Sequence, residues 1–117
     1  MENTIYGKFM QVVRNYPDQP AVIENAGTLT FSGLSDMVDR IANTFPDDLR
    51  TAGIVMTHRA EMIAAMLAVL KCGAMYVPAE PTFPAGRIRY MMNEANVDFV
   101  LTDMQFADKL EGMKMQF

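Results

Sequence analysis

The longest apolar run in the chain, Met62–Leu70, constrains the fold more than any other feature. Its nine residues are too few to cross a membrane, which takes about 18 or more. A helix that is apolar all round is instead expected to be buried. Short apolar strands are predicted on either side of it, at 54–56 and 75–77. A buried helix between two such strands predicts a right-handed crossover and therefore parallel pairing.

The remaining patterns extend this unit in both directions. A helical stripe over 4–16 is followed by short strands at 21–23 and 29–31, joined by a three-residue loop that ends at Gly27. After residue 77, the pattern predicts a helix around Ile88 and Met92, a strand at 98–102 and a short helix at 104–111. We therefore predict one α/β unit over residues 1–117, in the order αββαβαβαβ, with a mainly parallel sheet and an N-terminal hairpin. The tail from Gly112 to Phe117 is expected to fray.

The helix after the hairpin has the clearest periodicity. Ser32 is predicted to cap it, Pro46 to stop it, and Asp36 and Arg40 to pair on its solvent-facing side. Its apolar stripe has helical spacing and comprises Leu34, Met37, Val38, Ile41 and Phe45.

Charge and cysteine content exclude some functions. Ten Lys and Arg residues stand against 14 Asp and Glu, a formal charge of −4, which argues against nucleic-acid binding. Cys72 is the single cysteine, so no internal disulfide is possible. The N-terminus lacks the pattern of a secretion signal. With no predicted membrane segment, these features indicate a cytoplasmic protein.

Ligands of parallel sheets usually bind beyond the carboxyl ends of the strands. Here those ends are predicted at Thr57-His58, Pro78–Pro81 and Thr102-Asp103. No glycine-rich phosphate loop and no G-x-S-x-G motif accompanies them. His58 is either a base beside a ligand or a solvated loop residue, and the second reading is favoured because no partner group is evident.

Other chemically capable residues also have simpler interpretations. Cys72 is either a nucleophile or a small buried filler, and a filler is favoured at a helix C-terminus. The segment Pro78–Pro84 contains two P-x-x-P matches but is better read as a rigid crossover. The acidic residues form no evident pair; they include Asp36, Asp39, Asp47, Asp48, Glu94 and Asp98. We therefore assign no catalytic, cofactor-binding or metal-binding residue.

The segment Leu70–Pro84, LKCGAMYVPAEPTFP, resembles the second core motif of amino-acid adenylation domains, L-K-A-G-x-A-Y-V-P-[IL]-D-P-x-[YF]-P. These domains belong to nonribosomal peptide synthetases and to the wider adenylate-forming (AMP-binding) superfamily. Upstream, Leu29–Leu34 is similar to the first core motif, L-T-Y-x-E-L. Three further segments are similar to family landmarks, in family order: 17–22, 59–63 and 87–91. The chain departs from the family residues at Gly33, Cys72, Met75, Ala79, Glu80 and Gly86.

This resemblance implies the N-terminal part of an amino-acid-activating ligase. In such a parent, ATP and Mg²⁺ support formation of an aminoacyl-adenylate, and the aminoacyl group then passes to the phosphopantetheine thiol of a carrier protein. The family's nucleotide-binding motifs and its catalytic lysine come later than the motifs found here, so no site residue is carried over. Arg87 is expected to pair with an acidic side chain near its turn. The chain alone is predicted to be inactive, with the remainder of the adenylation domain as its partner.

Two alternatives remain open at this stage. In the first alternative, the chain is a freestanding interaction module or a homo-oligomer that uses apolar surface which a parent domain would cover. Otherwise it is a truncated remnant without a function of its own. The amino acid selected, and the choice between a synthetase module and a freestanding ligase, do not follow from these motifs.

Overall fold

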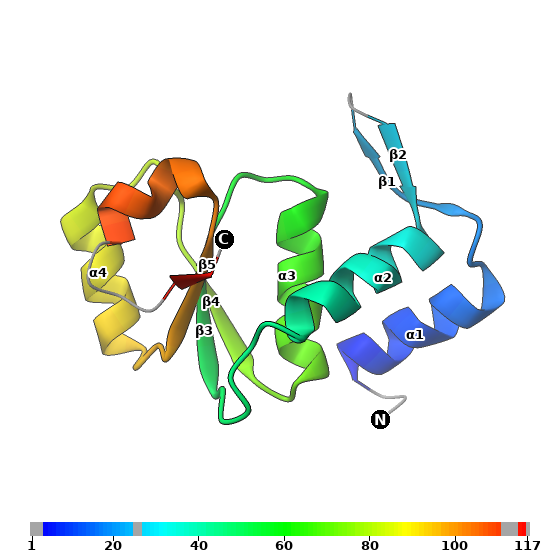
Figure 1. The fold of residues 1–117 in the computed structure, drawn as a ribbon, viewed down its shortest axis with the longest axis horizontal. Helices are drawn as coiled ribbons and strands as arrows, with labels where there is room; N and C mark the ends of the chain where they lie inside the picture. The colour runs from blue at the N-terminus through cyan, green and yellow to red at the C-terminus, as the bar shows by residue number, and fades with distance from the viewer. Residues whose placement is uncertain (1–3, 25–26, 111–114, 117) are drawn as a thin grey trace.

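The computed structural model describes residues 4–24, 27–110 and 115–116. Their order confirms the predicted α/β arrangement (Figure 1). The elements are α1 (Ile5–Asn15), β1 (Pro20–Glu24), β2 (Gly27–Thr30), α2 (Phe31–Ala42), β3 (Thr51–Val55), α3 (Ala60–Lys71), β4 (Met75–Pro78), α4 (Ala85–Glu94), β5 (Phe99–Thr102), the 3₁₀ helix η1 (Met104–Leu110) and β6 (Met115–Gln116).

The main sheet has the strand order β4-β3-β5-β6, and every neighbouring pair is parallel. The predicted parallel strands at 54–56, 75–77 and 98–102 are thus confirmed, with shifted ends. β3 begins at Thr51 because the Asp98 carboxylate accepts hydrogen bonds from the backbone N–H groups of Arg50 and Thr51, at 2.9 and 3.3 Å. β6 was not predicted, since two residues carry no periodic signal.

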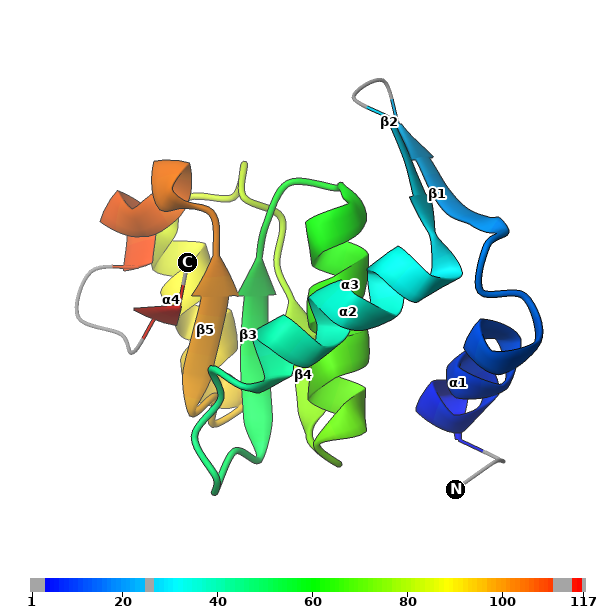
Figure 2. The same ribbon diagram turned by 45° about the vertical axis from the view of Figure 1, so that its right-hand side comes forward.

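Helices cover both faces of this sheet (Figure 2). Ala52 and Ile54 of β3 face a cluster formed with α2 and α3, in which Val38, Ala64 and Ala68 are also fully buried. On the other face, a second cluster contains Val55, Ala79, Ile88, Met92, Val100 and Leu110. Side chains along β3 therefore alternate between two cores, as expected for a central strand.

The buried helix predicted at 60–71 is α3, but only one side of it is buried. Ala64, Ala65, Ala68 and Val69 are buried, whereas Ile63 is 42% exposed. Gly73 ends the helix as predicted, at φ +75°, and the Ala74 N–H donates to the Val69 carbonyl at 3.1 Å. At this end, Lys71 Nζ donates to Asp39 Oδ1 of α2 at 2.6 Å, and this hydrogen bond raises the pKa of the Lys71 ammonium above its ordinary value.

α1 and the β1–β2 hairpin lie apart from the main sheet (Figures 1 and 2). No residue of α1 is fully buried; its stripe is half-buried, with Phe9 near Phe31 of α2. The hairpin is antiparallel, as predicted. Glu24 Oε1 connects it to α3 by accepting a hydrogen bond from the Ala60 N–H at 3.0 Å.

Three predicted details of the second helix were wrong. The cap is Thr30, whose Oγ1 accepts from the Gly33 N–H at 3.1 Å, because the chain turns into α2 at Phe31, before Ser32. α2 ends at Ala42, four residues before Pro46, and Phe45 is buried from the following turn. Asp36 and Arg40 form no ion pair; within the described residues, the ion pair of α2 is the one between Asp39 and Lys71.

Near the end of the chain, the predicted helix at 104–111 is the 3₁₀ helix η1. Fraying was predicted for Gly112 to Phe117; residues 112–114 and 117 lie outside the described residues, whereas Met115 and Gln116 pair with β5. In the part of the chain that the structure describes, no helix combines the length and apolar character required to span a bilayer.

Gly53 in the centre of β3 provides a test of this packing. A Cβ at Gly53 would collide with the Met92 sulfur and lie 3.3 Å from Val97 Cγ1. We expect Gly53→Ala to lower the free energy of unfolding by about 1 kcal/mol or more, measured by urea denaturation. Gly86→Ala is the matched control, because a Cβ there meets nothing within 4 Å and favours the helical conformation of α4. Equal effects of the two substitutions would contradict the packing described here.

Candidate functional site

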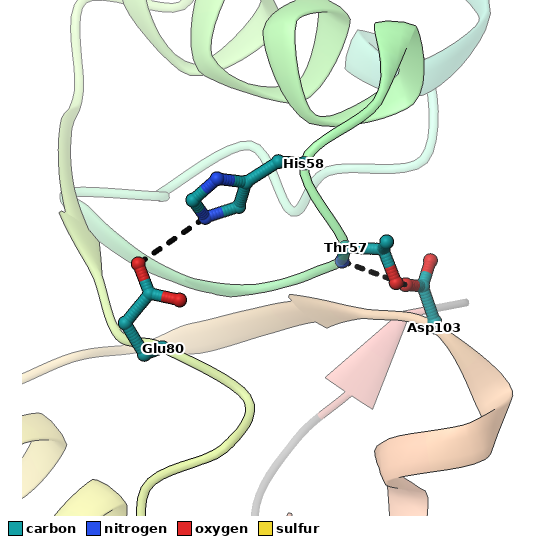
Figure 3. A network of polar contacts seen from close by, with 4 residues as sticks. All are labelled: Thr57, His58, Glu80 and Asp103. Carbon is teal, nitrogen blue, oxygen red and sulfur yellow. Dashed lines mark hydrogen bonds and ion pairs between the residues drawn. The ribbon is translucent and has the colours of Figure 1, made fainter.

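The three loops predicted to follow the carboxyl ends of β3, β4 and β5 meet at the carboxyl-terminal end of the sheet, which we call its switch-point edge (Figure 3). Thr57 and His58 follow β3, Glu80 follows β4, and Asp103 follows β5. The chain runs from β3 to β4 on one side and returns to β5 on the other. The edge between β3 and β5 is therefore a topological switch point, where ligands of open α/β sheets bind.

Asp103 joins the ends of β3 and β5 by a set of hydrogen bonds. Its Oδ2 accepts from the Thr57 N–H at 2.9 Å and from the Thr57 hydroxyl at 2.8 Å (Figure 3). Gln105 Nε2 donates to the same hydroxyl oxygen at 3.1 Å. Below them, the buried Thr102 hydroxyl donates to the Val55 carbonyl at 2.8 Å. These contacts fix the loop after β3 against the loop after β5.

His58 and Glu80 form the second contact of this edge. His58 Nε2 lies 3.2 Å from Glu80 Oε1, and the two side chains are 66% and 49% exposed. This exposure agrees with the favoured reading of His58 as a solvated loop residue. Exposed pairs of this kind contribute little to stability.

Other sequence candidates have different environments from those expected. Cys72 is exposed, so the prediction of a buried filler was wrong: it is the C-cap of α3, where the helix turns away from its packed face. Arg87 stacks on the Phe83 ring, 4.1 Å from its centroid, and pairs with no acid within residues 4–24, 27–110 and 115–116. Ala79 and Pro81 are buried, which supports the reading of the proline segment as a packed crossover.

A cavity of about 780 Å³ opens beside the switch point, between α2 and the ends of β3 and β5; we call it the α2 cavity. Its apolar lining consists of Met37, Ile41, Met56, Ala65 and Leu101. Arg40, Arg59, Glu61 and Asp103 are among its polar residues. The predicted ligand position at Thr102-Asp103 lies in the lining of this cavity, but the contribution of Met37, Arg40 and Ile41 was not predicted, because α2 comes to this end of the sheet only through packing between elements distant in sequence.

Among the residues that the structure describes, no three His, Cys, Asp or Glu side chains are grouped so as to hold a metal ion. The carboxylate at the switch point, Asp103, already accepts two hydrogen bonds from Thr57. This carboxylate oxygen is therefore engaged in the contact between the ends of β3 and β5.

The fold and its switch-point edge place the chain in a known class. It matches the AMP-binding enzyme family over residues 9–116, and it belongs to that family. It is 33% identical over 118 aligned positions to bacitracin synthase 1 of Bacillus licheniformis, covering 96% of this chain and 2% of that protein. It is 36% identical over 112 residues to surfactin synthase subunit 1 of Bacillus subtilis (strain 168), covering 89% and 3%.

Solved structures agree with this assignment. The nonribosomal peptide synthetase FmoA3 superposes with a TM-score of 0.84 at 28% identity, covering 94% of this chain and 13% of that one. The N-terminal subdomain of Klebsiella oxytoca NpsA has the same fold, with a TM-score of 0.84 at 20% identity, covering 96% of this chain and 30% of that one. The chain thus has the fold of the N-terminal subdomain of adenylate-forming enzymes and spans a small part of these relatives.

The contact between Asp103 and Thr57 should contribute more to stability than the exposed pair of His58 and Glu80. Asp103→Ala leaves the half-buried Thr57 N–H without its acceptor, so we expect a loss of about 1–3 kcal/mol in the free energy of unfolding. Glu80→Ala removes a carboxylate from the exposed pair and should cost at most about 0.5 kcal/mol. Urea denaturation of both variants measures the difference, and an Asp103→Ala variant as stable as Glu80→Ala would show that the contacts are not structural.

Proposed function

We propose that this chain is the N-terminal scaffold of an amino-acid adenylation domain. In the complete domain, ATP and Mg²⁺ would support formation of an aminoacyl-adenylate, and the aminoacyl group would be transferred to the phosphopantetheine thiol of a carrier protein. The residues described here would position the parallel sheet, while other parts of the domain would contact nucleotide. The chain alone is expected to have no adenylation activity.

One observation carries this proposal: within the motif segment Leu70–Pro84, the structure gives Gly73, Ala79 and Pro81 roles in backbone path and packing. Gly73 has the positive φ that ends α3, and Ala79 and Pro81 lie buried on the way to α4. The FmoA3 synthetase, whose chain includes the same fold, has also been solved with α-methyl-L-serine-AMP bound. That relative supports an adenylate-forming parent and leaves the amino acid of this protein open.

A chimera tests the scaffold role directly. Residues 9–116 of this chain would replace the matching segment of FmoA3, and ATP–pyrophosphate exchange would be measured with α-methyl-L-serine. We expect the chimera to retain exchange, because the scaffold contacts no nucleotide, and the isolated chain to show none. The control chimera carries Ile54→Asp, which places an unpaired charge in the core of β3 and should abolish folding and exchange together.

Two results would overturn the proposal. Robust exchange by the isolated chain would show that it holds nucleotide by itself. A chimera that folds cooperatively but lacks exchange would show that this chain does not act as an adenylation scaffold.

Protein interaction is a second candidate function, favoured by one surface. Ile23 of β1 and Ile63 of α3 are 77% and 42% exposed and line the same groove, of about 460 Å³, between the hairpin and α3. Apolar side chains gathered in this way are typical of contact surfaces.

On this hypothesis, the chain self-associates at high concentration, and Ile63→Lys shifts it toward the monomer by placing a charge in the contact. Ile5→Lys is the control, because Ile5 is 67% exposed on α1, outside the groove. Light scattering after size-exclusion chromatography measures the mass of each variant. A monomer at every concentration, with no partner retained in pull-down experiments, would contradict an interaction role.

A further inference from the structure

The β1–β2 hairpin is held to the rest of the chain differently at its two ends. At its base, β2 continues directly into α2, and the Phe31 N–H donates a hydrogen bond to the Gln19 carbonyl at 3.0 Å (Figure 2). Leu29 also packs closely on α2, since a Cβ at Gly33 would lie 2.8 Å from Leu29 Cδ1. The base is therefore fixed by the continuous chain, by a backbone hydrogen bond and by apolar packing.

The far end of the hairpin is held to α3 by one side chain. Glu24 is the last residue of β1 and pairs with Gly27, the first residue of β2. Its Oε1 accepts the hydrogen bond from the Ala60 N–H, and within residues 4–24 and 27–110 no other hydrogen bond joins β1 or β2 to α3. The neighbouring Ile23 is 77% exposed and buries little apolar surface there. The attachment of this end therefore depends on the Glu24 carboxylate.

The Ala60 N–H, in turn, has no other acceptor in its helix. Ala60 is the first residue of α3, and the first four N–H groups of an α-helix have no partner within the helix. The N-cap residue Arg59 supplies no side-chain acceptor, and Ala60 is only 3% exposed to water. A carboxylate also suits the positive end of the helix dipole. The contact thus caps α3 and anchors the hairpin at the same time.

A groove of about 460 Å³ lies between the two elements that this contact joins. Its lining includes Val22, Ile23 and Glu24 of β1 and Ala60, Met62, Ile63 and Met66 of α3. We propose that Glu24 is a latch: its hydrogen bond to the N-terminus of α3 holds the far end of the hairpin in place and so sets the width of the groove. When the bond is lost, the hairpin turns about its fixed base and the groove opens. This inference concerns a movement of the hairpin and does not rest on either proposed function.

Paramagnetic relaxation measured by NMR on the full chain tests the latch. A spin label is attached at Thr28→Cys, an exposed position of β2, after Cys72→Ser has removed the single native cysteine. The label should broaden the amide signals of Met62 and Met66 on α3. We expect Glu24→Ala to weaken this broadening, because the hairpin spends less time beside α3. It should also speed hydrogen exchange of the Ala60 amide by at least about tenfold, since a buried donor loses its acceptor.

Two further variants separate the hydrogen bond from charge. Glu24→Gln keeps a side-chain oxygen that can accept from Ala60, so we expect the broadening to be retained and the Ala60 exchange rate to stay within about threefold of the unchanged chain. Glu61→Gln is the matched control. Glu61 is an acid in the same first turn of α3, but it lines the α2 cavity and not the groove. Its replacement should leave the broadening unchanged.

The outcomes that would overturn the latch are distinct. In the first, Glu24→Ala leaves both the broadening and the Ala60 exchange rate as in the unchanged chain. In the second, Glu61→Gln has the same effect as Glu24→Ala, or Glu24→Gln is as severe as Glu24→Ala, so that charge near the helix end and not the hydrogen bond positions the hairpin. Protection of the fully buried Ile54 in β3 reports on the main sheet. Its loss in Glu24→Ala would show that the whole fold depends on the contact, which would also overturn a local latch.

Discussion

Hydrogen bonding of β3 to strands on both sides is the constraint on which the other elements depend. Ala52, Ile54 and Val55 are completely buried, and their side chains alternate between the two cores. The strand therefore sets the positions of α2 and α3 on one face and of α4 on the other. It also sets the edge where Thr57 meets Asp103, since that contact exists only while β3 and β5 remain in register.

Much of the fold follows from local patterns. The places where the structure differs from the sequence-based prediction have specific physical causes. The apolar run 62–70 and its flanking strands predicted the parallel crossover because burial requires those patterns. The true cap at Thr30 depends on one hydrogen bond from Gly33, and the start of β3 at Thr51 on two hydrogen bonds to Asp98, none of which a periodicity reveals. The α2 cavity is lined by residues of α2, of α3 and of the ends of β3 and β5, which no local pattern brings together.

The family motif has a structural meaning in this chain. Gly73 ends α3, the following strand β4 pairs with β3, and Ala79 and Pro81 are buried before α4 begins. Its residues thus determine backbone path and packing, which explains why the replacement of alanine by Cys72 at an exposed helix end is tolerated. Similarity in such a segment is evidence for a shared scaffold, and evidence about chemistry must come from other residues.

The strand order also has a consequence for how the chain acquires its structure during synthesis. β3 is the first strand of the main sheet to leave the ribosome, and it occupies an inner position with β4 on one side and β5 on the other. Each later strand can therefore add to an edge that already exists, and β6 extends the sheet beyond β5 in the same way. Growth outward from an early central strand lets each later strand pair with one that is already present, which favours vectorial folding.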